Sequence, residues 1–415
     1  MNSQTQHTTQ YKNSPLGLIP EEWEVKTLGE LVDKIIGGGT PSRDNPIFWN
    51  GNIPWATVKD LSTFNPLKTQ EFISDLGLKS SSANLIPKNT LITATRMALG
   101  KVVRYEVDVT INQDLKAIFP KKDLSTNFLF YWFEQNSKTI NDLGNGSTVK
   151  GITLDDLKSI KFLKIPLPEQ KAIADCLSTW DLAIEKQNIL IKQKELSKKA
   201  LIQQLLSGEK RLKGFSEEWK EVRLGAIFNR VIRKNDEKNT NVVTISAQRG
   251  FILQGDYFNK IVASDILDNY FLVKKGEFCY NKSYSNGYPW GATKRLNDFE
   301  KAVVTTLYIC FGIKDQSKSS GDFFEQYFEA NLLDKGLTKI AHEGGRAHGL
   351  LNVTPNDFFG LKITIPQLEE QAAIANVLQC SDREIQLLKI KLTQLKEQKK
   401  GLMQVLLTGK KRLKI

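Results

Sequence analysis

The sequence lacks the features that would mark a membrane or metal-binding protein. It has no run of about 18 or more apolar residues, so a membrane-spanning segment is not expected. Residues 1–11 are polar and lack an apolar signal core, which favours a short disordered tail on a cytoplasmic protein. With only three histidines and no CxxC pair, no zinc-ligand spacing is present. We expect buried free thiols at the four cysteines, which are Cys176, Cys279, Cys310 and Cys380.

Motifs that bind cofactors or carry catalysis are also missing. Gly37 to Gly39 lead into Thr40-Pro41-Ser42 without the third glycine of a dinucleotide-binding loop, and Ile152 follows Gly151 where a P-loop would have lysine. Asn281-Lys282-Ser283-Tyr284 matches the flipped-base tetrapeptide of amino-methyltransferases only at its ends, and no GxSxG nucleophile elbow occurs. These absences favour a binding protein whose chemistry another chain supplies.

Length and positive charge are the informative bulk properties. At 415 residues the chain is too long for one compact core. Its 40% apolar and 25% charged residues are typical of a globular protein. The net charge of +12 attracts polyanions, and phosphate neutralisation supplies most non-specific affinity for nucleic acid. Charge alone leaves a nucleic-acid partner as one option among several.

The first half of the chain repeats in the second half. Residues 169–174 (EQKAIA) return as 370–375 (EQAAIA), and residues 205–213 (LLSGEKRLK) return as 406–414 (LLTGKKRLK). Other landmarks pair at slightly different offsets, including the two Glu-Glu-Trp motifs. This drift indicates one ancestral half that was duplicated and then altered by small insertions. A chain with two similar halves can bind two similar objects at a fixed separation.

Each half ends in a segment with the pattern of a long helix. From 167 to 207 there is no glycine, the single proline (Pro168) suits a first helical turn, and Gly208 suits a C-terminal cap. Apolar residues recur at alternating steps of four and three, which predicts a coiled coil. The seam of the first helix comprises Ile173, Leu177, Trp180, Ile184, Ile191, Leu201 and Leu205, with Gln187, Lys194 and Lys198 between them. The seam of the second comprises Ile374, Leu378, Ile385, Leu388, Leu392, Leu395, Leu402 and Leu406, with Ser381 and Lys399.

The two predicted helices are expected to pair with each other. About 38 residues make a rod of roughly 57 Å, which needs a partner along its length. Because the first helix leads through the second globular half into the second helix, a pseudo-two-fold axis would make the pair antiparallel, with one globular domain at each end. The alternative is that each helix packs only on its own domain.

The globular stretches, 12–165 and 215–365, have the texture of strands and loops. Runs such as Thr90–Ala94 and Val303–Ile309 are typical of strands, and glycine-rich and proline-containing turns punctuate them. A short amphipathic helix is expected at Asn127–Asn136, with a counterpart in the second half. We predict a mixed, mainly antiparallel α+β domain that is used twice.

Cationic and small polar residues gather in the predicted loops of both halves. Loops flanked by glycine let backbone N–H groups approach phosphates, while Arg and Lys add charge and hydrogen bonds to base edges. Each residue alone is more readily explained as a solvated surface charge, but the clusters in two equivalent domains favour nucleic-acid binding. The candidates are Thr40, Ser42, Arg43, Arg96, Lys101, Thr148 and Lys150 in the first half, and Arg249, Lys282, Tyr284, Lys294, Arg346 and His348 in the second.

The order of these segments resembles the specificity subunit of type I restriction-modification systems. The matching motifs are the helix starts at 165–174 and 365–375, the Leu-Leu-x-Gly-x-Lys-Arg-Leu helix exits, Glu-Glu-Trp near each domain start, Gly-Gly-Thr-Pro-Ser at 38–42 and Asn112-Gln113 before a strand. The likeness spans essentially the whole chain. The second half has no Gly-Gly-Thr-Pro-Ser, so we expect the two domains to recognise different sequences.

The resemblance implies a domain organisation and a mode of DNA binding. The segments would be a disordered tail (1–11), target recognition domain 1 (12–166), a central helix (167–214), target recognition domain 2 (215–366) and a C-terminal helix (367–415). Each recognition domain would bind one part of a split target in double-stranded DNA, and the helix pair would set the spacer between the parts.

The resemblance also implies where the chemistry resides. The helices would dock two methyltransferase subunits that carry S-adenosylmethionine, and restriction subunits that use ATP with Mg would join through them. The chain itself would hold no cofactor and no metal, catalyse no reaction and bind no membrane. Two alternatives stay open from the residues: a degenerate DNA methyltransferase or nuclease, against which the missing cofactor loops argue, and a stand-alone basic coiled-coil adaptor, which would have no use for the positive charge.

Overall fold

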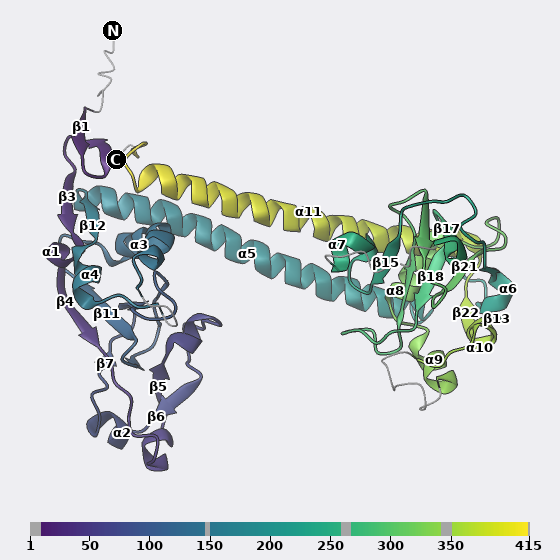
Figure 1. Cartoon of the computed structure of the whole chain (residues 1–415), viewed down its shortest axis with the longest axis horizontal. Helices are drawn as coiled ribbons and strands as arrows, with labels where there is room; N and C mark the ends of the chain where they lie inside the picture. The colour runs from purple at the N-terminus through teal and green to yellow at the C-terminus, as the bar shows by residue number, and fades with distance from the viewer. Residues whose placement is uncertain (1–9, 146–149, 259–266, 342–350, 414–415) are drawn as a thin grey trace, which may run out of the picture. The chain divides into compact units, whose positions relative to one another are not determined.

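The chain folds into two compact units, each containing one globular half (Figure 1). The computed structural model describes residues 10–145, 150–258, 267–341 and 351–413. Unit 1 comprises Met1–Asn188 and Ile390–Ile415, and unit 2 comprises Ile189–Lys389. The two longest helices, α5 (Leu167–Leu206) and α11 (Leu368–Leu406), each contribute to both units. Each unit therefore contains a stretch of both long helices.

Unit 1 is built on two four-stranded sheets. The first has the antiparallel order β4 (Val32–Gly37), β11 (Leu115–Pro120), β8 (Leu91–Ala94), β9 (Val102–Val103). The second has the order β6 (Glu71–Ile73), β5 (Ile53–Ala56), β10 (Val109–Ile111), β7 (Leu85–Ile86), with β10 parallel to β5. Two strand pairs complete the unit, β1 (Tyr11–Ser14) with β2 (Gly17–Pro20) and β3 (Glu24–Thr27) with β12 (Lys161–Lys164). The shorter helices are α1 (Leu28–Leu31), η1 (Pro46–Trp49), η2 (Val58–Leu61), α2 (Asp75–Lys79), α3 (Thr126–Asp142) and α4 (Leu154–Ser159).

Unit 2 repeats the first of these sheets. Its four strands have the antiparallel order β14 (Phe228–Val231), β21 (Ile309–Ile313), β18 (Phe278–Asn281), β19 (Ala292–Arg295). The strand pairs are β13 (Lys220–Arg223) with β22 (Lys362–Ile365), β15 (Val243–Ser246) with β16 (Gly250–Leu253) and β17 (Phe271–Lys274) with β20 (Lys301–Val304). The shorter helices are α6 (Leu224–Ile227), α7 (Gln254–Phe258), η3 (Leu267–Asn269), α8 (Gly321–Glu329), α9 (Asp334–Ile340) and α10 (Pro355–Gly360).

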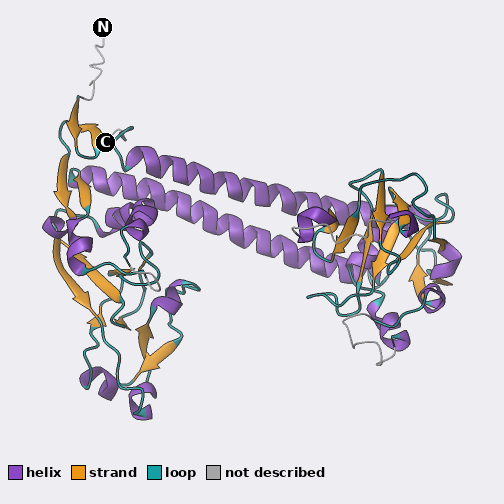
Figure 2. Ribbon diagram, in the orientation of Figure 1, coloured by secondary structure: helices purple, strands orange, loops and turns teal. Residues whose placement is uncertain are grey.

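The strand orders confirm the predicted internal repeat. Strands β4, β11, β8 and β9 correspond in order to β14, β21, β18 and β19, and the β3–β12 pair corresponds to β13–β22. Helices and strands mix in each unit, and the pairing is mainly antiparallel (Figure 2). The predicted α+β fold class is therefore confirmed. The β8–β9 and β18–β19 connections therefore occupy equivalent places in the two sheets.

Some local predictions differ from the structure. Val303–Ile309, interpreted as one strand, contains the connection between β20 and β21, because Thr305 to Tyr308 form a turn. Tyr11, assigned to the disordered tail, begins β1 and donates a hydrogen bond to the Gly409 carbonyl at 3.2 Å, while residues 1–9 lie outside the described part of the chain. Among the cysteines, Cys279 and Cys310 are buried as expected, Cys176 is half-buried and Cys380 is exposed.

Each unit buries residues from both long helices in one hydrophobic core. In unit 1, Ile173 and Leu177 of α5 share a core with Met403 and Leu406 of α11 and with Leu407, which follows it. In unit 2, Leu205 and Leu206 of α5 share a core with Ile374, Ala375 and Leu378 of α11. Full burial of a large apolar side chain stabilises a fold by about 1.5–3 kcal/mol. The alternative in which each helix packs only on its own domain is therefore wrong.

The two helices run antiparallel within each unit, and their predicted seams face inward. Every seam position given above, apolar or polar, is buried or half-buried. Several polar seam positions form ion pairs between the helices. In unit 1, Lys399 Nζ lies 2.6 Å from Asp181 Oδ1. In unit 2, Lys198 pairs with Asp382, and Lys194 Nζ lies 2.6 Å from Glu384 Oε1.

A buried glutamate joins the start of one helix to the exit of the other. In unit 1, Glu169 accepts hydrogen bonds from the Trp23 indole at 3.2 Å and from Arg412 Nε and Nη2 at 2.9 Å each. The hydrogen bonds to Glu169 raise the pKa of the Arg412 guanidinium. We call this set the unit 1 glutamate clasp. An N–H group and an Arg fork satisfy a carboxylate that would otherwise be costly to bury.

Unit 2 contains the same arrangement, the unit 2 glutamate clasp. Glu370 accepts from the Trp219 indole at 3.2 Å and from Arg211 Nε and Nη2 at 2.6 Å each. The repeated motifs Glu-Glu-Trp, Glu-Gln and Lys-Arg-Leu thus meet in space, because each contributes one member of the clasp. In both units the buried carboxylate couples the helix pair to the domain start.

The glutamine after each clasp glutamate holds the end of another helix. Gln170 Oε1 accepts from the backbone N–H of Ser125, the N-cap of α3, at 2.7 Å. Its Nε2 donates to the carbonyl groups of Ile165 and Asp123 at 2.8 and 2.9 Å. In unit 2, Gln371 accepts from the N–H of Ser320, the N-cap of α8, at 2.9 Å. The helix-start motif therefore orients α3 and α8 against the long helices.

Candidate nucleic-acid interface

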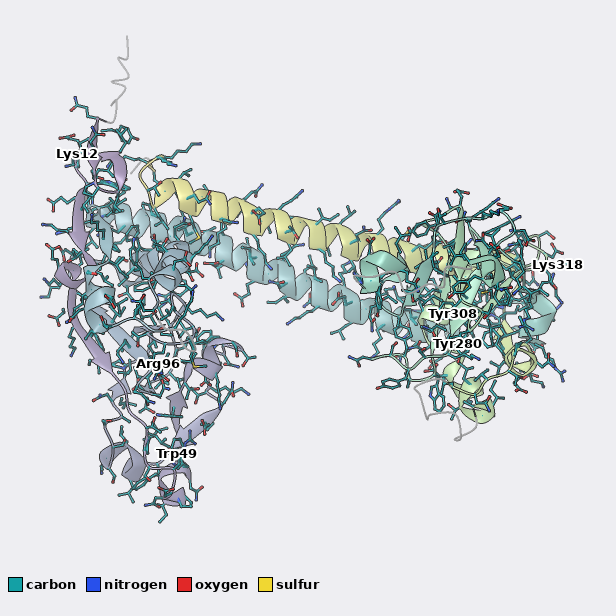
Figure 3. All side chains as sticks on the ribbon, viewed as in Figure 1. Lys12, Trp49, Arg96, Tyr280, Tyr308 and Lys318 are labelled. Carbon is teal, nitrogen blue, oxygen red and sulfur yellow. The ribbon has the colours of Figure 1, made fainter. Side chains whose placement is uncertain are left out.

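In unit 1, two of the predicted residues lie against one segment, residues 112–116. Thr40 Oγ1 donates to Gln113 Oε1 at 2.7 Å, and Arg96 Nη1 lies 3.6 Å from Asp114 Oδ1. The Arg96 side chain remains 58% exposed, so its guanidinium can still reach a ligand (Figure 3). Loops that are separate in the sequence, after β4 and after β8, are thus brought together at one edge of the sheet.

Two glycines allow the loop after β4 to pack closely against the end of β10. A Cβ atom on Gly38 would lie 1.7 Å from the carbonyl oxygen of Ile111, and one on Gly39 would lie 2.1 Å from Ser82 Oγ. The Gly39 N–H donates to that same Ile111 carbonyl at 3.0 Å. Because no side chain fits at either position, the Gly-Gly-Thr-Pro-Ser motif has a packing reason: it presses the backbone before Thr40 onto the end of β10.

The β8–β9 connection, residues 95–101, carries Arg96 and Lys101 and is anchored at several points. The Met97 N–H donates to the Lys150 carbonyl at 3.0 Å, and the Ile152 N–H donates to the Thr95 carbonyl at 2.9 Å. These bonds place the exposed residue Lys150 beside the loop that holds Arg96. Lys101 is exposed and lines an open hollow of about 610 Å³. Thr148 lies outside the described residues.

Arg43 and Ser42 belong to a different contact set. Arg43 forks to Glu71, with Nη1–Oε1 at 2.5 Å and Nη2–Oε2 at 3.1 Å, and its guanidinium lies 3.5 Å from the centre of the Trp49 ring. These hydrogen bonds lower the pKa of Glu71. The Ser42 carbonyl accepts from the Trp49 indole at 2.9 Å. Arg43 therefore holds η1 against β6, in addition to any role at the surface.

In unit 2, three predicted residues gather on adjacent loops. Gln248 Nε2 donates to the Asn286 carbonyl at 2.9 Å, which ties the β15–β16 turn to the β18–β19 connection. Arg249 is exposed in that turn. In the connection, Tyr284 is exposed and Lys282 is half-buried, with its carbonyl bonded to the Leu351 N–H at 3.0 Å. Arg346 and His348 lie outside the described residues.

Lys294 has a different role from the one predicted. The residue is only 5% exposed, and its Nζ donates to both carboxylate oxygens of Glu329 at 2.6 Å and to the Tyr288 hydroxyl at 3.4 Å. It lies in β19 rather than in a loop, and its side chain is occupied inside the unit. The interpretation of Lys294 as a DNA contact is therefore corrected to a structural ion pair.

Sequence reasoning missed Lys116, which belongs to the unit 1 cluster. Its Nζ donates to the Gln113 carbonyl at 2.5 Å, and partial burial lowers the pKa of its ammonium group. Lys116 escaped prediction because it lies in β11, whereas the predicted contacts were cationic and small polar residues in expected loops. The signal that could have found it is the Asn112-Gln113 motif directly before that strand.

Comparison with known proteins identifies the family. The family model described as "Type I restriction modification DNA specificity domain" matches residues 20–193 and 216–397, one match for each half of the chain. The chain belongs to this family. In the part of the chain that the structure describes, no helix has both the length and the apolar character needed to cross a bilayer.

Individual relatives support the same assignment. The type I restriction enzyme MjaIX specificity subunit of Methanocaldococcus jannaschii is 32% identical over 206 residues, which is 47% of this chain and 45% of that protein. The chain thus spans about half the length of that relative. The putative type I restriction enzyme MjaX specificity subunit of the same organism is 25% identical over 442 residues, and this match covers 97% of each chain. A crystal structure of the type I system S subunit from M. genitalium has the same fold, with a TM-score of 0.53, 18% identity and coverage of 93% of this chain and 96% of that one.

Proposed function

We propose that this chain is the DNA sequence-specificity subunit of a type I restriction-modification enzyme and binds a bipartite target, one half-site per recognition domain. The observation that carries the proposal is that the family match occurs twice, once on each half, and that each unit places cations on or beside the loop joining the last two strands in the order of the repeated sheet. Arg96 with Lys150 in unit 1 and Arg249 with Lys282 in unit 2 are the leading contacts. The net charge of +12 supports a polyanionic ligand.

The proposal assigns the helix pair two roles. The first is to set the spacer between the half-sites, for which the inward seam and the clasps supply stiffness. The second is to dock two methyltransferase subunits, with restriction subunits joining through them. Exposed apolar side chains support docking, because in unit 2 Ile189 and Leu196 are one heptad apart on α5 and Leu387 is exposed on α11. The partners would supply S-adenosylmethionine chemistry and ATP with Mg, and the complex would act in the cytoplasm.

The first experiment selects bound duplexes from a randomised library with the chain in complex with its methyltransferase partner. We expect a split consensus with an unread spacer. Deleting one heptad from both helices, residues 187–193 and 388–394, shortens the rod by about 10 Å, which corresponds to about three base pairs. The selected half-sites should stay the same while the spacer shortens. Retention of the original spacer would show that the helix pair does not set the distance between the half-sites.

Two controls separate the competing functions. Deleting residues 187–193 alone shortens one helix and breaks the register between the two seams. This variant should therefore have a lower free energy of unfolding and gain no new spacer preference. Duplex affinity that falls steeply with salt supports DNA binding, whereas affinity for duplexes that is undetectable at low salt would favour the protein-only adaptor. Transfer of a labelled methyl group to DNA by the chain alone would favour the degenerate methyltransferase.

A further inference from the structure

Met97 has a combination of properties that the fold does not require. It is 66% exposed, and in the described part of the chain only Leu196, at 68%, is more exposed among the large apolar residues. Its φ is +64°, in the left-handed region. The loop is held in this conformation by the bond from the Met97 N–H to the Lys150 carbonyl and by Leu99, which is buried in the unit 1 core.

The backbone conformation makes an apolar side chain costly at this position. A left-handed φ costs a residue with a Cβ atom about 1–2 kcal/mol, which glycine does not incur. An exposed methionine also gains little from burial within its own unit. Strained positions that persist cluster at ligand-binding sites. A long apolar side chain held out by a strained, well-anchored loop therefore indicates a contact with a ligand.

The equivalent loop of unit 2 presents a side chain of the same kind. Tyr284 lies in the β18–β19 connection, the counterpart of the β8–β9 connection that carries Met97, and it is also 66% exposed. Each residue has a cation nearby, Arg96 next to Met97 and Lys282 two residues before Tyr284. The two units differ in sequence in these loops but repeat the pairing of an exposed large side chain with a cation.

The surroundings of Met97 favour DNA over a protein surface as its ligand. Arg96, Lys101 and Lys150 are exposed around it. On the edges of base pairs in the major groove, the apolar group is the C5-methyl of thymine, and the other groups donate or accept hydrogen bonds. We propose that Met97 is a specificity-determining residue that contacts the methyl group of one thymine in the half-site bound by unit 1. This inference rests on the proposed function.

The experiment compares thymine with uracil, which lacks only the methyl group. The full chain with its methyltransferase partner is first used to select its target, and duplexes are then made with uracil in place of each thymine of the two half-sites in turn. For the wild type we expect about a fourfold loss of affinity at one position, the factor for burying one methyl group. Met97→Ala should bind the thymine and uracil duplexes equally at that position, and Met97→Leu should restore the difference.

Two further variants serve as controls. Met97→Gly relieves the left-handed strain, so its thermal stability should equal or exceed that of the wild type while discrimination is lost. Leu18→Ala removes a side chain of similar exposure, 63%, elsewhere in unit 1 and should leave discrimination intact.

The possible outcomes are distinct. If the wild type selects a bipartite target but uracil has the same effect in wild type and Met97→Ala at every position, the inference is overturned and the proposed function stands. A Met97-dependent rise in 2-aminopurine fluorescence, without a uracil effect, would also overturn it, because the side chain would then separate bases instead of touching a methyl group. If the wild type selects no duplex at all, the proposed function itself fails.

Discussion

Arg412 donates two hydrogen bonds to the two carboxylate oxygens of Glu169, each at 2.9 Å. Glu169 lies in the first turn of α5, whereas Arg412 follows the end of α11. Since Glu169 is 1% exposed, its charge depends on this fork and on the Trp23 indole. The exit of the C-terminal helix is thereby fixed to the start of the central helix, within unit 1.

Removing Arg412 should destabilise unit 1 strongly. In Arg412→Ala the Glu169 carboxylate stays buried without its main partner, and breaking such a pair costs about 3–5 kcal/mol. The free energy of unfolding, measured with urea, should fall by an amount in this range. Lys410→Ala, an exposed cation in the same segment, is the control and should change it little. Equal unfolding curves for Arg412→Ala and the wild type would contradict the role of the unit 1 glutamate clasp.

Gln170→Glu tests the glutamine that holds the α3 N-terminus. The substitution keeps an oxygen for the Ser125 N–H but removes the donors to the Ile165 and Asp123 carbonyls. Leaving the buried Ile165 acceptor unsatisfied costs about 1–3 kcal/mol, and the half-buried Asp123 acceptor adds to this, so the melting temperature should drop by several degrees. Gln193→Glu, at an exposed position of α5, is the matched control. A drop of the same size in both variants would show that added charge, not lost bonds, is the cause.

Substitutions of Lys294 and Arg96 should affect different properties, the first the stability of the fold and the second the selectivity of DNA binding. Lys294→Ala removes the buried partner of Glu329 and should lower the free energy of unfolding by about 1–3 kcal/mol, with unchanged selectivity in the folded protein. Arg96→Ala should leave unfolding unchanged and relax selectivity in one half-site only. Duplex selection and urea unfolding on both variants check this. Loss of affinity across unrelated duplexes would make Arg96 a phosphate contact instead.

Glu134 should make stability depend on pH in a defined direction. Partial burial of the Glu134 side chain, which remains 36% exposed, raises its pKa above the ordinary value of 4.5, although Lys399 acts against this shift. The folded protein therefore binds this proton more tightly than the unfolded chain, and the associated stability is lost as pH rises through the raised pKa. Relative to Glu134→Gln, the wild type should lose stability as pH rises above 4.5 and match the variant below it. Unfolding free energies measured from pH 4 to 8 test this; a difference that grows as pH falls would contradict it.

The long helices were predictable because their signals are local. A heptad repeat needs only the spacing of residues along one helix, and the seam from Ile173 to Leu205 appears in the sequence without any knowledge of the partner. The repeat was visible for the same reason, since Glu169 and Glu370 sit in matching motifs. The structural role of these motifs could not be predicted from the sequence, because Trp23, Glu169 and Arg412 come into contact only after the chain has folded.

The loop contacts show the opposite case. Lys294 and Arg96 look alike in the sequence, as cations near glycine, yet one is paired with Glu329 inside unit 2 and the other is 58% exposed. Which of them can reach a ligand depends on strand pairing and, for Lys294, on a carboxylate far along the chain.

The amino-acid sequence by itself determined the duplicated plan, the pair of heptad helices and the basic character of the chain, because periodicity, repetition and charge are properties of residues read in order. The tertiary structure decided which helix end packs in which core and which cations form ion pairs. It also decided that the Met97 side chain is exposed on a strained loop. Those outcomes depend on contacts between distant segments, whose energies exist only once the sheets and helices have brought the segments within a few ångströms of each other.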